Sequence, residues 1–165
     1  MNTVEVSTVV YLPPKEVYEF LLDFPRYARY SEHLTEVRQF GDGTPGTEYA
    51  LEFAWWKLSY TARSRVTDAE RPRRIDWRVI EDIDAVGYWR VDPLEDEETE
   101  VTLVVEYAPD SANDDAVDLP RFVSLEWVVR KVKPKIRAEA ERVVRRIVAD
   151  LEGERRDVTI EIETS

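Results

Sequence analysis

The sequence contains no cysteine and only one histidine, and these absences remove several kinds of chemistry. Disulfide bridges, thiolate metal sites and a cysteine nucleophile are excluded. A lone histidine without cysteine cannot build an ordinary zinc site, and no nucleophile elbow accompanies it. His33 lies in the polar stretch YSEHLTE, so we interpret it as a surface or supporting residue rather than a general base.

Long apolar runs are also missing. No run approaches the 18 residues of a transmembrane helix, and the N-terminal MNTVEVSTVV lacks the basic and apolar regions of a signal peptide. We therefore expect a cytoplasmic protein with no stable membrane insertion. The formal net charge of −12 argues against nucleic acid and anionic membrane surfaces as partners, because both require a basic face.

Lysine is scarce, with 5 Lys against 18 Arg, although the chain is strongly acidic. Salt screens the self-repulsion of an acidic surface, so a cytoplasm of high salt concentration favours such a composition. This pattern indicates a halophilic source, and an ordinary acidic protein is the alternative.

The first 34 residues alternate between element types. Residues 4–12 alternate apolar and polar positions, which predicts a half-buried strand. Pro13 and Pro14 end that strand and begin a short helix, because proline is favourable at the first helical position. Pro25 ends the helix, and RYARYSE has room only for a second, shorter helical turn.

The rest of the chain divides into a strand-rich part and a helical part. Between Leu34 and Pro109, turn signals separate about six strands at hairpin spacing, which predicts an antiparallel sheet. Apolar residues then follow helical spacing from Leu119 to Leu151, with Pro134 predicted to kink or break the helix near Val132–Lys133. Residues 1–154 are expected to form one domain, and 155–165 a strand-like or flexible extension.

This order of elements is similar to that of the START-like superfamily with the helix-grip fold, the class of the birch pollen allergen. The chain looks most like its polyketide cyclase/dehydrase and coenzyme Q-binding branch. The resemblance is carried by VVYLPPKEVYEFLLDFPRYARY, PRRIDWRVIEDIDAVGYWRVDPLEDEETEVTLVVEY and VVRRIVADLEGE, within residues 4–154. It implies an α+β fold in which a curved seven-stranded antiparallel sheet wraps around the long C-terminal helix. The two short helices after the first strand would brace one end of that helix.

A sheet that grips a helix leaves room for a cavity, and aromatic residues on successive strands are typical of an apolar pocket. The predicted ligand-pocket residues are Tyr49, Leu51, Phe53, Tyr60, Ala62, Ser64, Trp77, Trp89, Val105, Tyr107, Phe122 and Val129.

The resemblance implies binding or transport of a hydrophobic small molecule: a lipid, an isoprenoid quinone or a polyketide-like compound. The alternative is an enzyme of the polyketide cyclase, aromatase or dehydratase type that uses the same cavity. No acid/base pair stands out in the sequence, so catalytic residues are not assigned and enzymatic activity is left open. No metal and no cofactor are expected, and the oligomeric state is left open.

The charge yields a first testable prediction. If the acidic composition is an adaptation to high salt, the melting temperature rises markedly between low salt and molar KCl, because screening removes self-repulsion. Differential scanning fluorimetry across this range measures the effect, with sucrose at matched osmolality as the control. A melting temperature that is independent of KCl contradicts the halophilic interpretation.

Overall fold

The computed structural model describes residues 2–23, 25–26, 30–55, 58–95, 97–108, 125–153 and 159–164. The side chains of residues 55, 58, 125–129, 132–137, 139–140 and 164 also lie outside this description. The elements are β1 (Asn2–Val10), α1 (Pro14–Leu22), β2 (Leu34–Phe40), β3 (Glu48–Trp55), β4 (Leu58–Glu70), β5 (Arg74–Val79), β6 (Asp84–Pro93), β7 (Thr99–Ala108), α2 (Leu125–Glu152) and β8 (Glu161–Thr164).

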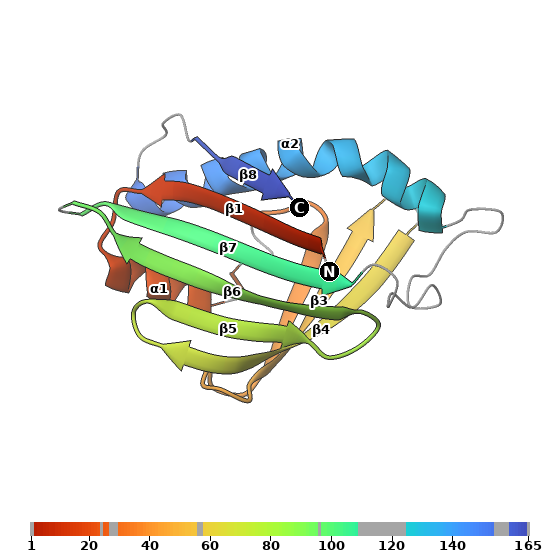
Figure 1. Ribbon diagram of the computed structural model, residues 1–165, viewed down its shortest axis with the longest axis horizontal. Helices are drawn as coiled ribbons and strands as arrows, with labels where there is room; N and C mark the ends of the chain where they lie inside the picture. The colour runs from red at the N-terminus through yellow and green to blue at the C-terminus, as the bar shows by residue number, and fades with distance from the viewer. Residues whose placement is uncertain are drawn as a thin grey trace.

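All eight strands form one antiparallel sheet in the order β2-β3-β4-β5-β6-β7-β1-β8. Strands β2 to β7 are consecutive hairpins, as their spacing in the sequence predicts. β1 crosses to the far side and pairs with β7. Figure 1 shows the sheet curling, with β1 and β8 alongside α2 and with β3 and β4 behind β6 and β7. The predicted antiparallel sheet with a long C-terminal helix is confirmed.

The predicted number of seven strands is wrong, because the tail adds an eighth. β8 pairs with the edge of β1, where Val6 faces Ile162. Residues 161–164 of the predicted extension 155–165 thus pair with the same sheet. Its four paired residues are too few to predict a partner strand from the sequence, and that partner lies at the opposite end of the chain.

The helical predictions are only partly covered by the described residues. The second short helical turn, over residues 26–32, lies partly outside the described residues. Residues 119–124 of the predicted long helix also lie outside them. From Leu125 to Glu152, α2 continues through Pro134 without a break.

Helix α1 begins and ends where the prolines require. Pro13 is extended at the N-cap, with φ −62° and ψ 150°, and Pro14 occupies the first turn. Tyr18 and Leu21 are buried on the helix face that meets the sheet, while Lys15 and Glu16 face solvent. The helix ends at Leu22, two residues before the undescribed position 24 and three before Pro25.

One face of the sheet, here called the inner face, packs against both helices. Its buried apolar side chains contact Val17, Phe20 and Leu21 of α1 and Val148 of α2. Burial of this face is the main source of stability, at roughly 25 cal/mol for each Å² of apolar surface removed from water. The members contributed by the sheet are Val10, Leu34, Val37, Tyr49, Val66, Ile75, Val91 and Val101.

Two irregularities help the sheet to curve. The register shifts by one residue at Thr35 in β2 and again at Thr67 in β4. Such bulges increase the local twist and bend the strand that carries them. The extra residue at Thr67 also keeps Val66 and Ala69 on the inner face, opposite Trp77 and Ile75.

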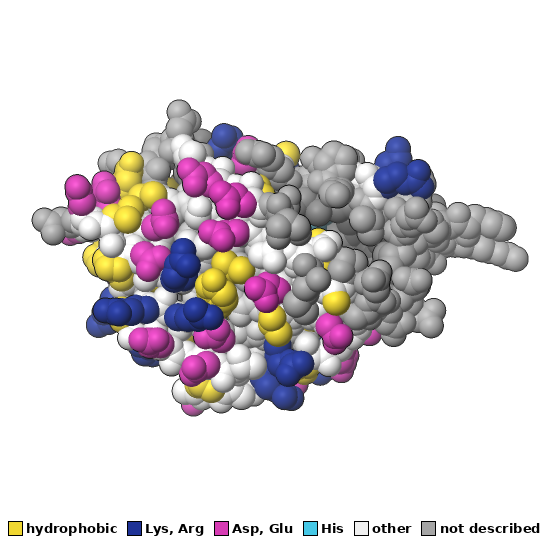
Figure 2. Space-filling model, in the orientation of Figure 1, with side chains coloured by type: hydrophobic (Ala, Val, Ile, Leu, Met, Phe, Trp, Pro, Cys, Tyr) yellow, Lys and Arg dark blue, Asp and Glu magenta, His cyan; other side chains and the backbone are white. Residues whose placement is uncertain are grey.

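The outer face of the sheet carries charged side chains of both signs, which Figure 2 shows interspersed across it. Arg74 binds Asp76 through both carboxylate oxygens at 2.9–3.1 Å and lies 3.8 Å from the ring centre of Tyr88. Arg90 repeats the pattern with Asp92 at 2.7 Å. Exposed ion pairs of this kind contribute at most about 1 kcal/mol each, so they serve solubility more than stability.

Gly87 in β6 is needed for close packing. It pairs with Trp77, whose indole lies over it, so a Cβ at this position would lie 2.5 Å from Cζ2 of Trp77. The same Cβ would lie 2.6 Å from the carbonyl oxygen of Val104. Backbone cannot yield as a flexible side chain can, so any larger residue here must move the ring and the strand.

This contact predicts that Gly87→Ala lowers the free energy of unfolding by about 1–3 kcal/mol, the usual cost of overpacking. Urea denaturation followed by tryptophan fluorescence measures the change. Val86→Ala, at the neighbouring exposed position, is the control and is expected to change stability by about 0.5 kcal/mol or less. Equal stability of Gly87→Ala and the wild type contradicts the prediction.

Candidate functional site

The strand register places the predicted pocket residues of the sheet on the inner face. Along β3 and β4, Tyr49 faces Ser64, Leu51 faces Ala62, and Phe53 faces Tyr60. Along β5, β6 and β7, Gly87 lies between Trp77 and Val105, and Ala85 faces Tyr107. Trp89 lies on the same face, opposite Ile75 and Leu103.

Of the remaining two predicted residues, Phe122 lies outside the described residues. Val129 lies in α2, and its side chain is outside the description.

One end of the inner face is closed by the packed core. Tyr49, 1% exposed, belongs to this core, and Leu51 and Trp89 pack against it. The C-terminal turns of α2 complete it through Val143, Val144, Ile147, Val148 and Leu151. At this end the aromatic residues fill a solid core rather than line a space.

A small polar cluster fixes α2 over this closed end. The hydroxyl of Tyr30 donates to Asp150 of α2, and Nη1 of Arg146 donates to the carbonyl oxygen of Tyr30 at 3.2 Å. The ring of Tyr30 meets that of Phe20 of α1 edge to face, with centres 5.9 Å apart. Burial, followed by the bond to Asp150, raises the pKa of Tyr30, so the hydroxyl stays protonated as a donor.

The other end of the inner face is open. Phe53 is 38% exposed, and Tyr60, Ala62, Ser64 and Trp77 are only partly buried. In the described part of the chain, none of these five belongs to the packed core. The N-terminal half of α2 lies toward this end, because its C-terminal half packs over α1. The predicted pocket set therefore splits into a packed part and an open part.

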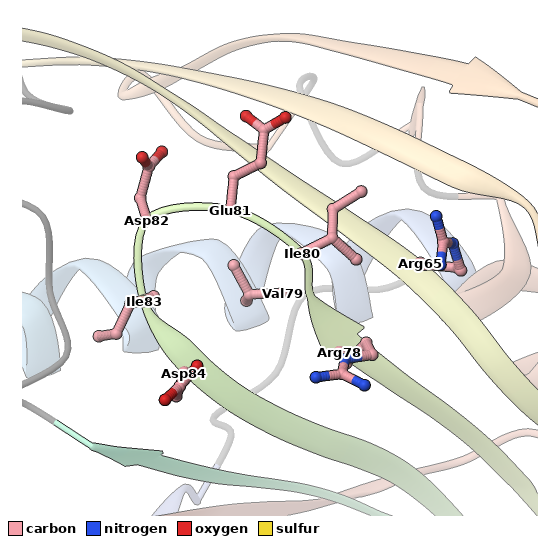
Figure 3. A pocket seen from close by; sticks show the side chains of 8 residues that line it. All are labelled: Arg65, Arg78, Val79, Ile80, Glu81, Asp82, Ile83 and Asp84. Atoms are coloured by element: carbon pink, nitrogen blue, oxygen red, sulfur yellow. The ribbon is translucent and has the colours of Figure 1, made fainter.

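A cavity of about 600 Å³ lies at the turn between β5 and β6, where Arg65 and Arg78 of the outer face form part of its wall. Figure 3 shows Glu81 and Asp82 at the turn and Arg65 across the opening from them. The lining residues are Arg65, Arg78, Val79, Ile80, Glu81, Asp82, Ile83 and Asp84. The cavity thus combines apolar side chains with charges of both signs.

A second, smaller hollow of about 360 Å³ lies over β5 and β6. It is lined mainly by residues of the outer face, among them Arg74, Tyr88, Val104 and Glu106. Most of its walls belong to the face opposite the predicted pocket.

Asp82 is the site residue that sequence reasoning missed. An acidic hairpin turn indicates solvated carboxylates, but Asp82 is half-buried and adopts φ 73°, in the left-handed region. Burial raises the pKa of Tyr60 of β4, and the nearby negative charge of Asp82 raises it further. A non-glycine residue in this conformation signals that the surroundings hold it in place, which the sequence does not reveal.

Two further polar groups lie near the inner face: the imidazole of His33, which the sequence singles out, and the indole N–H of Trp77. Nδ1 of His33 lies 3.3 Å from the carbonyl oxygen of Ala54, which ties β2 to β3 at a half-buried position. The indole N–H of Trp77 is buried and has no hydrogen-bond partner among the described residues. The described residues contain no cluster of acidic or histidine side chains that could hold a metal ion and no helix suited to cross a membrane.

Comparison with known proteins connects this geometry to a family. The model of the family "Polyketide cyclase / dehydrase and lipid transport" matches residues 1–148. No curated protein sequence matches the chain.

Several solved structures share the fold. An aromatase/cyclase, Zhui, from Streptomyces sp. R1128 is 23% identical with a TM-score of 0.63, over 92% of this chain and 94% of that chain. A START superfamily protein from Mycobacterium smegmatis is 15% identical with a TM-score of 0.64, over 92% and 99%. A point mutant of norcoclaurine synthase from Thalictrum flavum is 12% identical with a TM-score of 0.61, over 92% and 97%.

These similarities confirm the helix-grip architecture that the sequence predicts, although at such identities they concern the fold alone. The family match covers most of the chain and does not depend on them. The chain belongs to the polyketide cyclase/dehydrase and lipid transport family.

Proposed function

We propose that the chain binds a hydrophobic small molecule between the open end of the inner face and the N-terminal half of α2. The observation that carries this proposal is the exposure of Phe53 and the partial burial of Tyr60 and Trp77, aromatic residues that face inward without joining the core. Apolar walls with a few polar groups are typical of ligand pockets. The binding domain comprises residues 1–154 in this proposal, with the 155–165 segment closing the edge of β1.

The full pocket set proposed from the sequence is retained, with its members in unequal roles. Tyr49, Leu51 and Trp89 form the floor against the core, and Phe53, Tyr60, Ala62, Ser64, Trp77, Val105 and Tyr107 line the open part. Phe122 and Val129 remain in the proposed set on the sequence alone. A ligand class of lipids, isoprenoid quinones or polyketide-like aromatics fits an apolar space of a few hundred Å³.

The setting proposed for this function is a cytoplasm of high salt concentration, which the net charge of −12 supports. The same charge disfavours nucleic acid as a partner.

The second candidate is an enzyme that cyclises, aromatises or dehydrates such a molecule in the same space. The family description and the similar aromatase/cyclase favour it. Tyr60 and Asp82, whose negative charge raises the pKa of Tyr60, are also the kind of proton donor and acceptor that such chemistry needs. A pure carrier returns its ligand unchanged, whereas an enzyme converts it, so mass spectrometry of the released ligand distinguishes the two.

Binding is tested by native mass spectrometry of gently purified protein and by melting curves with a panel of fatty acids, quinones and flavonoids. A ligand at 100 times its dissociation constant adds about 2.7 kcal/mol to the free energy of unfolding. For a chain of this size this raises the melting temperature by roughly 5–10 °C. An unchanged melting temperature across the whole panel, with no copurified ligand, contradicts the proposal.

The location of the space is tested by adding bulk at two alanines on the inner face of β4. Ala62→Phe at the open end is expected to abolish ligand binding with little loss of stability, because the added ring occupies empty space. Ala69→Phe, opposite Ile75 at the packed end, is the matched control and is expected to cost about 1–3 kcal/mol without blocking the open end. If Ala62→Phe is as destabilising as Ala69→Phe, the open end is packed and the proposed pocket is wrong.

A further inference from the structure

The C-terminal strand β8 covers the edge of β1 that faces away from β7. It pairs antiparallel with Val4–Ser7, so the ladder covers four of the nine residues of β1. Next to the ladder, the hydroxyl of Thr8 donates to the carbonyl oxygen of Thr159 at 2.9 Å. Ile160, directly before β8, is only 7% exposed. Among the described contacts, a short ladder, a side-chain hydrogen bond and a buried isoleucine thus hold the tail on β1.

Without β8, the edge of β1 would be a pairing surface. A free strand edge presents backbone N–H and C=O groups that can bind another strand, and proteins usually protect such edges with lysine, proline or other charges. β1 has the sequence NTVEVSTVV, which contains four valines, one charged residue, Glu5, and no lysine or proline. β8 also lies outside residues 1–148, which the family model matches. The cover is therefore a feature of this chain that the family match does not describe.

The cover meets β1 with charges of the same sign. Glu163 of β8 lies directly opposite Glu5, and Glu161 lies opposite Ser7. The strands β1, β7 and β8 together contain five glutamates and no lysine or arginine. Strand alternation places all five on the outer face, and Figure 2 shows acidic side chains gathered over β1 and β8. Like charges directly opposite each other weaken strand pairing, so salt strengthens the attachment of β8 by screening them.

The sequence of β1 is suited to pairing with itself. If two β1 strands pair antiparallel about Val6, each Val6 faces its own copy, Val4 faces Thr8 and Glu5 faces Ser7. Inner-face residues then meet inner-face residues, and no glutamate lies opposite another. β8 instead brings a glutamate opposite Glu5. Its advantage is that it belongs to the same chain, which gives it a high effective concentration at the edge.

We propose that the edge of β1 is an interaction surface for a second copy of this chain, and that β8 covers it within the monomer. Because the cover and the edge are both acidic, the cover is held more firmly as the salt concentration rises. When β8 is detached, two chains join through their β1 strands into one continuous antiparallel sheet. This inference goes beyond the proposed ligand binding and does not depend on it.

The salt-dependent cover is tested on the full chain by hydrogen–deuterium exchange with mass spectrometry. In the wild type, protection of the amides in 161–164 is expected to rise between 0.1 and 1 M KCl. Glu163→Gln removes the repulsion from Glu5, so its protection at 0.1 M KCl is expected to be roughly 1.5- to 5-fold higher and to depend less on salt. Glu95→Gln, exposed near the β6–β7 turn, removes the same charge elsewhere and is the matched control. Equal protection in the two variants, or a wild type that does not respond to KCl, overturns the role of charge in the cover.

The pairing surface is tested by detaching β8 with Ile162→Pro. Proline removes a ladder donor opposite Val6, so the short pairing is lost. Size-exclusion chromatography with light scattering at 0.15 M KCl is expected to give a monomer for the wild type and a dimer for this variant. In the Ile162→Pro background, Ser7→Lys places a positive charge opposite Glu5 of the second copy, and Ser7→Glu a negative one. The lysine variant is expected to dimerise about fourfold or more tightly than the glutamate variant, because the two-fold symmetry repeats the pair.

The outcomes separate the parts of the proposal. A folded Ile162→Pro that stays monomeric overturns the interaction surface. Equal dissociation constants for the two Ser7 variants also overturn it, because association then uses another face of the molecule. A dimeric wild type overturns the covering role of β8. If circular dichroism shows that Ile162→Pro does not fold, β8 is required for folding and is not a detachable cover, so the proposal fails. None of these results bears on the proposed ligand binding.

Discussion

A single long helix has to cover the inner face of an eight-stranded sheet, and the shape of the molecule follows from this constraint. A flat sheet would leave most of its apolar side chains in water, so the strands must bend around α2. The bulges at Thr35 and Thr67 supply bending, and Gly87 lets the indole of Trp77 lie flat against its neighbours. Curvature, register and packing therefore depend on one another, and none of them can change alone.

The same constraint divides the inner face into two regions. At one end α1 and the last turns of α2 together cover the apolar side chains of the sheet. Tyr30 links the two helices through its contacts with Phe20 and Asp150. No second helix reaches the other end in the described part of the chain, so side chains such as Phe53 remain partly exposed there. In the proposed function this less covered region takes the ligand, while packing at the closed end supplies the stability.

Local patterns predict the local structure well. Alternating apolar residues place every strand from β2 to β7, because a strand with one buried face repeats every second residue. Glycine, proline and acidic clusters mark the turns between them. The inward direction of Tyr60 and Trp77 follows from the same alternation. The pattern does not show how completely each inward side chain is covered. It therefore does not distinguish Tyr49, which is buried in the core, from Phe53, which is exposed.

The missed features depend on contacts between distant residues. β8 has four paired residues and gains its partner from the first strand of the chain. Asp82 reads as a solvated turn residue because nothing near it in sequence indicates Tyr60, more than twenty positions earlier. A carboxylate in a turn does not by itself indicate a functional site. The position of Asp82 near Tyr60 becomes apparent only in the structure, where the turn continues along β4.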